Sequence, residues 1–144
     1  MNNSKKPQTL AKIGIYSLIL AMIITVAIII YATHPWGGNY ANQMFTDYVY
    51  LLAFSFWSII PYLALMILIH LFKEYKLSYY IVISGSEVII LTSLLFLIDT
   101  VFIHPNSQGA YIFLFLPIYQ WLAILLLGIV VGIAFQLNKN ITVG

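Results

Sequence analysis

Four long runs of uncharged, mostly apolar residues constrain this 144-residue chain more than any other feature. A helix rises about 1.5 Å per residue, so roughly 20 apolar residues cross a bilayer core of roughly 30 Å. Strands are excluded, because open strands leave backbone groups unpaired in lipid and a barrel would show alternating polarity. The runs therefore predict four membrane-spanning helices, at about 13–33, 48–70, 77–98 and 111–136.

The composition supports the same class of protein. Hydrophobic residues make up 62% of the chain and charged residues 7%, whereas charged residues are roughly 25% of a soluble domain. The four runs use most of the chain, so we expect residues 1–144 to form one membrane domain, an all-α bundle of four helices. The first run is longer than the apolar part of a cleaved signal peptide, so we expect it to remain as an anchor.

The lysines predict the orientation of the bundle. They precede the first run, separate the second from the third, and follow the fourth: Lys5, Lys6, Lys12, Lys73, Lys76 and Lys139. The loops 34–47 and 99–110 contain no Lys or Arg. By the positive-inside rule both termini lie in the cytoplasm, and we expect a multi-pass protein of the plasma membrane, the inner membrane if the cell is bacterial.

Aromatic residues mark the expected ends of the spans. Tyr and Trp side chains favour the level of the lipid headgroups, where an apolar ring and a polar tip are both accommodated. One group lies at the predicted outer ends, with Tyr31, Trp36, Tyr40, Tyr48 and Tyr50. A second lies at the predicted inner turn, with Tyr75, Tyr79 and Tyr80.

Glu87 is the one full charge inside a predicted span. An ionised carboxylate in the bilayer centre costs at least about 2.5–3.5 kcal/mol, so we expect a neutral acid that faces the other helices. Equal depth along the other helices places Thr25, Ser58 and Gln120 at the same level. The sequence thus predicts a midplane polar layer to which each helix contributes one side chain.

Two interpretations of Glu87 remain open. An acid inside a membrane commonly marks a proton or cation path, which would make the layer functional. Alternatively, a protonated Glu87 hydrogen-bonds Gln120, Ser58 or the carbonyl that Pro61 leaves free one turn earlier, and so joins the helices. The chain offers no basic partner and no second acid inside the spans, which favours the structural interpretation.

Glycines indicate where helices approach closely. Gly14 and Gly85 lie among other small residues of the first and third runs. Gly128 and Gly132 form a GxxxG motif in the fourth run, a spacing that lets a second helix pack at short range. The motif fits either a helix of the same bundle or another copy of the chain.

Patterns for catalysis, metal binding and nucleic-acid binding are missing from the sequence. It contains no nucleophile elbow, zinc-protease motif or phosphate-binding loop, no cysteine and no dense basic stripe. Asp47, Asp99, His34 and His104 lie outside the spans at spacings typical of no metal site, and we expect them to end helices. We therefore expect no enzyme activity, no cofactor, no metal and no nucleic-acid partner.

Two functions remain for a chain of this kind. The first is a non-enzymatic accessory or immunity-type protein that acts by helix contacts with a second copy or with another membrane protein, as the GxxxG motif suggests. The second is a small oligomeric transporter or channel component in which Glu87 lines a polar path. The lipid bilayer is the surrounding medium in both.

Overall fold

The computed structural model describes the backbone of residues 5–33, 41–105 and 111–143, and the side chains of residues 12–33, 46–105 and 111–137. Within these ranges the chain is helical apart from short turns, and it contains no strand. In chain order the elements are α1 (Lys5–Thr33), α2 (Ala41–Phe72), α3 (Lys76–Ile98), the π-helical segment η1 (Asp99–Ile103) and α4 (Ile112–Val143). The prediction of an all-α chain is confirmed.

Each helix contains a segment long and apolar enough to cross a membrane. These segments are Lys12–Thr33, Thr46–Phe72, Lys76–Ile103 and Ile112–Leu137. The helices extend beyond the predicted runs, because a backbone hydrogen-bond ladder continues through polar residues as readily as through apolar ones. α3 ends at Ile98, as predicted, with Asp99 as its C-cap, and the apolar segment continues from there through the π-helical η1 to Ile103.

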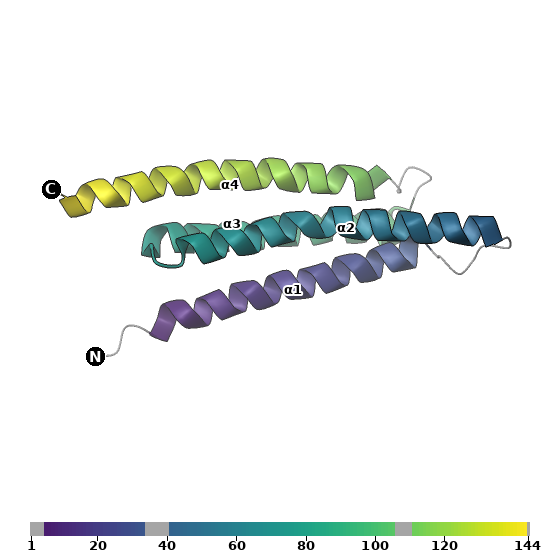
Figure 1. Cartoon of the computed structure of the whole chain (residues 1–144), viewed down its shortest axis with the longest axis horizontal. Coiled ribbons are helices and arrows are strands. Elements are labelled where there is room, and N and C mark those ends of the chain that lie inside the picture. Colours follow the sequence, from purple (N-terminus) through teal and green to yellow (C-terminus); the bar gives the residue numbers. More distant parts are fainter. Residues whose placement is uncertain (1–4, 34–40, 106–110, 144) are drawn as a thin grey trace.

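The α2–α3 hairpin forms the centre of the bundle. α1 and α4 each contact both hairpin helices, and in Figure 1 they lie on opposite sides of the hairpin. The start of α1 and the end of α4 lie at the same end as the short α2–α3 turn, which we call the hairpin end (Figure 1). The chain thus has an antiparallel up-and-down order, as short connections between neighbouring helices dictate.

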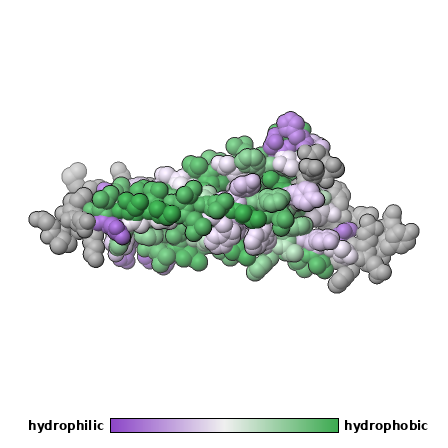
Figure 2. All heavy atoms as spheres, turned by 90° about the horizontal axis from the view of Figure 1, so that it is seen from above, coloured by the Kyte–Doolittle hydropathy of each residue, from purple (hydrophilic) through white to green (hydrophobic). Residues whose placement is uncertain are grey.

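Two groups of buried apolar side chains hold the helices together. The group toward the hairpin end includes Leu18, Tyr62, Leu65, Tyr79 and Val82. The group toward the opposite end consists of Ile28, Ile29, Leu97, Phe113 and Leu116. Large apolar side chains also cover the outside, and Figure 2 shows them over most of one face, with hydrophilic residues nearer the ends. An apolar exterior of this extent suits lipid as the solvent.

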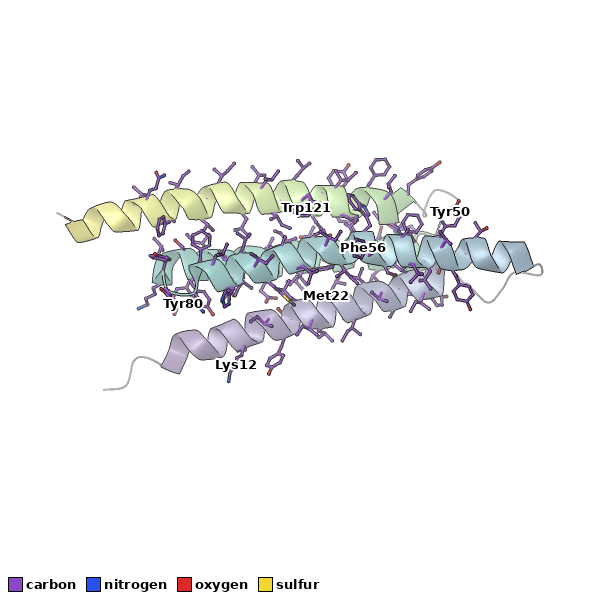
Figure 3. All side chains as sticks on the ribbon, in the orientation of Figure 1. Lys12, Met22, Tyr50, Phe56, Tyr80 and Trp121 are labelled. Carbon is purple, nitrogen blue, oxygen red and sulfur yellow. The ribbon has the colours of Figure 1, made fainter. Side chains whose placement is uncertain are left out.

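Most aromatic residues of the predicted belts are exposed near the ends of the bundle. Figure 3 places Tyr80 at the hairpin end and Tyr50 at the opposite end, and Tyr31, Tyr48 and Tyr75 are exposed as well. Tyr79 is an exception to the predicted belt, because its side chain is 1% exposed and belongs to the apolar core. Trp36 and Tyr40 lie outside the described residues.

Candidate functional site

Four polar side chains, one from each helix, meet inside the bundle at what we call the Gln120 level: Thr25, Tyr62, Ser93 and Gln120. The Thr25 Oγ1 atom lies 3.1 Å from the Tyr62 hydroxyl, and Gln120 Nε2 donates to Ser93 Oγ over 2.9 Å. The Tyr62 hydroxyl also lies beside the Gln120 side chain. None of the four residues is more than 3% exposed. The two pairs therefore form one buried polar contact that joins all four helices.

One hydrogen-bond acceptor at the Gln120 level has no partner. Ser93 Oγ donates its single proton to the Ile89 carbonyl over 2.7 Å and accepts from Gln120. Gln120 Oε1 is buried and has no hydrogen-bond partner in the part of the chain that the structure describes. A buried acceptor without a donor costs about 1–3 kcal/mol, so this oxygen is a place where a donor would bind.

Glu87 lies at a second level, with Ser17 of α1 as its partner. The Ser17 hydroxyl contacts Glu87 Oε1, and it also donates to the Gly14 carbonyl over 2.9 Å. A hydroxyl has one proton and cannot serve two acceptors fully. A proton on the Glu87 carboxyl gives each contact its own donor, and a neutral acid also avoids placing a charge among apolar helices.

The expected pairing of Glu87 with Gln120, Ser58 or a freed carbonyl is wrong. Glu87 lies less than two turns before Ser93 on α3, about 9 Å closer to the hairpin end. The middle of the segment Lys76–Ile103 lies between Glu87 and Ser93, and the physical reason is the axial position of α4, which places Gln120 beside Ser93. Thr25, Ser58 and Gln120 are buried, at 2%, 5% and 3% exposure. Whether they act as a functional layer stays a prediction.

Ser17, Tyr62 and Ser93 complete these contacts and were not among the predicted site residues. Depth along a helix can be counted from the sequence, but the direction of a side chain around the helix axis depends on how the helices pack. One signal was available for Ser17, which follows Gly14 by three residues and therefore shares its helix face. Tyr62 offered none, because a Tyr in an apolar run more often marks a span boundary.

The four candidate glycines differ in what surrounds them. A Cβ atom at Gly85 would overlap the Leu127 side chain of α4, and one at Gly14 would lie 3.6 Å from Ile69 Cδ1. A Cβ atom at Gly128 or Gly132 would have nothing within 4 Å. Gly85 and Gly14 therefore lie at contacts inside the bundle, whereas Gly128 and Gly132 face open space, Gly128 at the edge of a groove between α2 and α4.

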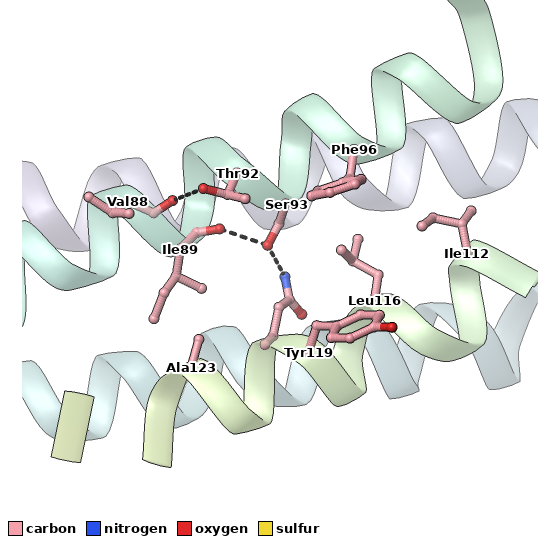
Figure 4. A pocket seen from close by; sticks show the side chains of 10 residues that line it. Val88, Ile89, Thr92, Ser93, Phe96, Ile112, Leu116, Tyr119 and Ala123 are labelled. Atoms are coloured by element: carbon pink, nitrogen blue, oxygen red, sulfur yellow. Dashed lines mark hydrogen bonds between the residues drawn. The ribbon is translucent and has the colours of Figure 1, made fainter. Parts of the chain in front are cut away.

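A cavity of about 440 Å³ lies between α3 and α4. We call it the α3–α4 cavity; its walls include Val88, Thr92, Ser93, Phe96, Tyr119 and Gln120. Figure 4 shows the α3 residues facing the α4 residues across it, with the dashed line from Ser93 ending on the amide nitrogen. Thr92 donates to the Val88 carbonyl over 2.8 Å, so its proton is used within α3.

The acidic and imidazole groups near the ends of the helices make one local contact. His104 Nδ1 lies 2.9 Å from Asp99 Oδ1, and the His104 backbone N–H donates to the Asp99 carbonyl over 2.7 Å. Both side chains are more than half exposed, so the pair adds little stability. Among the described residues no group of three or more His, Asp and Glu side chains could hold a metal ion. His34 lies outside them.

Comparison of the chain with protein-family models, with curated proteins and with solved structures finds no match. The function is therefore argued from the geometry alone.

Proposed function

We propose that this chain is an integral membrane protein of four spans that acts without catalysis, by contact between the outer face of α4 and another membrane helix. The observation that carries the proposal is the open position of Gly128 and Gly132, where an added Cβ atom would meet nothing within 4 Å. We define the α4 contact face by these two glycines and the exposed Leu125, Ile129 and Ile133.

Glycine at such positions has a cost that packing within the bundle does not offset. In a helix interior Gly is about 1 kcal/mol less favourable than Ala. At Gly85 the close approach of Leu127 explains the glycine, but the α4 contact face has no such neighbour within the described residues. Two glycines four residues apart let a second helix approach its backbone closely, and this close packing drives helix association in lipid.

The orientation proposed for the bundle has both termini in the cytoplasm. Lys12, Lys73 and Lys76 belong to the hairpin end, where α1 begins and α4 ends (Figure 1). A one-sided distribution of lysines of this kind corresponds to the cytoplasmic side of the plasma membrane, the inner membrane in a bacterial cell. The exposed tyrosines near both ends of the bundle correspond to the two headgroup levels and so support spans that cross the membrane.

The role proposed for the contact is that of an accessory or immunity-type protein, one that binds a membrane protein and alters its action. The described polar groups are few and mostly paired with one another, which favours binding over catalysis. The alternative is a transporter or channel component that uses Glu87. That role would require the Glu87–Ser17 contact between α1 and α3 to open and admit an ion or a proton.

Crosslinking tests the α4 contact face, and the chain suits it because it contains no cysteine. We expect Ile129→Cys to form a disulfide-linked dimer in membranes if the partner is a second copy, or a crosslink to another membrane protein through a bifunctional maleimide reagent. Gly128→Ile together with Gly132→Ile should reduce that crosslink at least about tenfold, because the added side chains keep the backbones apart.

A control for the glycine variant is Val130→Ile, which adds a methyl group at an exposed position two residues from each glycine and therefore on the opposite side of α4. It should leave the crosslink unchanged. Equal crosslinking in the double-glycine variant and the control would remove the α4 contact face from the proposal. The folding of each variant is checked by its helical circular dichroism in detergent.

Reporter fusions test the proposed orientation. We expect alkaline phosphatase fused after Asn3 or after Gly144 to be inactive, and green fluorescent protein at the same positions to be fluorescent, because both ends lie in the cytoplasm. Phosphatase inserted after Pro105, past the end of the third span, provides the positive control and should be active. An active phosphatase at either terminus would contradict the proposed orientation while leaving the α4 contact face to be tested separately.

A further inference from the structure

The hydrogen bonds around the α3–α4 cavity leave an acceptor free and use up the side-chain donors on its α3 wall. The protons of Thr92 and Ser93 go to α3 carbonyls, over 2.8 Å and 2.7 Å, and Gln120 Nε2 donates to Ser93. Gln120 Oε1 remains without a partner. A guest with a hydrogen-bond donor would satisfy this oxygen, whereas a guest that only accepts hydrogen bonds would not.

The walls of the cavity favour an uncharged guest. The residues around it are apolar, aromatic, hydroxyl or amide side chains, and none of them is ionisable at neutral pH. A charged headgroup would be buried there without a counter-ion, at a large cost. The volume, about 440 Å³, lies within the range of ligand pockets, roughly 300–1,000 Å³, so the apolar body of the guest can be of moderate size.

The mouth of the cavity opens on the outer face of the bundle, where Val88, Phe96 and Tyr119 are 63%, 56% and 65% exposed. With the helices in a membrane, this face is in contact with lipid. Entry from the bilayer selects compounds that dissolve there and carry their donor into the hydrocarbon region.

We propose that the α3–α4 cavity binds an uncharged, membrane-soluble alcohol, whose hydroxyl donates to Gln120 Oε1 and whose hydrocarbon body fills the apolar walls. Gln120 lines the cavity, and rotation about the broad terminal torsion of its side chain can turn Oε1 toward the guest. The proposal rests on the membrane placement given above but does not depend on the α4 contact face.

Photolabelling tests the proposal on the full chain in phosphatidylcholine vesicles. The probe is a long-chain primary alcohol that carries a diazirine, and its control is the methyl ether of the same alcohol, which keeps the body but cannot donate. We expect the alcohol to label peptides of the cavity wall about three- to tenfold more than the ether, in line with single hydrogen bonds in membranes. An unlabelled alcohol should compete.

Variants assign the effect to one atom and one cavity. Gln120→Leu should lower alcohol labelling to the level of the ether and leave ether labelling unchanged, and Gln120→Met provides a second apolar replacement if the first does not fold. Ala123→Phe should fill the cavity and remove both signals, whereas Leu122→Phe, the neighbouring exposed position, should keep them.

Three results would overturn the proposal. Equal labelling by alcohol and ether would mean that any hydrocarbon fills the cavity, such as a lipid acyl chain. Alcohol labelling that persists in both Gln120 variants would mean that another atom holds the hydroxyl. Labelling spread evenly over the exposed residues would mean that no site exists. Gly128→Ile with Gly132→Ile should not change the labelling, so failure here is distinct from failure of the α4 contact face.

Discussion

Two polar contacts of α3 differ in how well donors and acceptors match. Toward the hairpin end, Ser17 of α1 contacts Glu87 and donates to the Gly14 carbonyl, so a proton on the Glu87 carboxyl would give each contact its own donor. Less than two turns further along, Ser93 contacts Gln120 of α4, and one carbonyl oxygen is left without a donor. With that proton, the contact of the ionisable residue is the one in which donors and acceptors match.

This difference shows that the type of a polar residue in an apolar bundle is a weaker guide to function than its hydrogen-bond balance. A carboxyl group inside a span is commonly interpreted as functional, because its charge is costly in lipid. Once it is neutral and paired, it joins helices as Ser or Asn does. An amide with one unmatched oxygen beside a cavity keeps binding capacity, and for this reason the α3–α4 cavity is the better candidate for a ligand.

The largest expected effect concerns Gly85, where α3 lies against the Leu127 side chain of α4. Gly85→Leu should destabilise the fold by about 1–3 kcal/mol, because the new side chain would occupy the space of Leu127 and overpack the contact. Unfolding in mixed micelles with increasing dodecyl sulfate, followed by circular dichroism, measures the change in the free energy of unfolding.

Gly128→Leu is the matched control for this substitution, since the same side chain is added on α4 where a Cβ atom meets nothing within 4 Å. We expect its free energy of unfolding to stay within about 0.5 kcal/mol of the parent chain. Equal destabilisation by the two substitutions would mean that α4 is rotated relative to the arrangement described, and the comparison between the two contacts of α3 would fail.

A smaller effect should distinguish the two polar contacts directly. We expect a double-mutant cycle of Ser17→Ala and Glu87→Leu to give a coupling energy of about 0.6–1.7 kcal/mol, the range of side-chain hydrogen bonds in membrane proteins. The cycle of Ser93→Ala and Gln120→Leu should give less, because replacing Gln120 also removes the unmatched oxygen and thereby offsets the lost bond.

The coupling energies are measured by the same unfolding assay, with Ser17→Ala and Gln120→Leu as the control pair. Those two residues lie at different levels, so their effects should add within about 0.5 kcal/mol. A larger coupling for Ser93 and Gln120 than for Ser17 and Glu87 would reverse the order of the two contacts.

The sequence predicts the helices well, because their existence depends on length and apolar composition alone. An apolar run of more than roughly 20 residues is read as a spanning helix wherever its side chains point. The helix ends are predicted less accurately, because α2 begins at Ala41 and continues through the polar residues Asn42, Gln43 and Asp47. The expected belt position of Tyr79 fails for a related reason, because depth does not state which face of α3 is buried.

The partners of the polar residues depend on rotation and axial shift, which no single run of sequence contains. A shift of one helix by about two turns changes the level of a side chain by about 11 Å, enough to separate Glu87 from Gln120. Gln120 Oε1 lacks a donor because Ser93 donates its hydroxyl proton to the Ile89 carbonyl and accepts from Gln120 Nε2. Hydrogen-bond partners of this kind depend on how the helices pack, so they could not be predicted from the sequence.

The smallest expected effect belongs to Glu87→Gln, and it tests whether the balanced contact is structural. Gln keeps the size of the side chain and provides an N–H donor for Ser17 in place of the carboxyl proton. The free energy of unfolding should therefore change by less than about 0.5 kcal/mol, and membrane insertion and crosslinking through Ile129→Cys should persist. Infrared spectra at neutral pH should show the carbonyl band of a protonated carboxyl in the parent chain and lose it in the variant, because Glu87 is the one carboxyl group inside the predicted spans. A parent chain without that band would show that Glu87 is ionised and that the proton count at Ser17 is wrong.

A folded, inserted Glu87→Gln protein that loses a proton-coupled activity would assign Glu87 to a transport path.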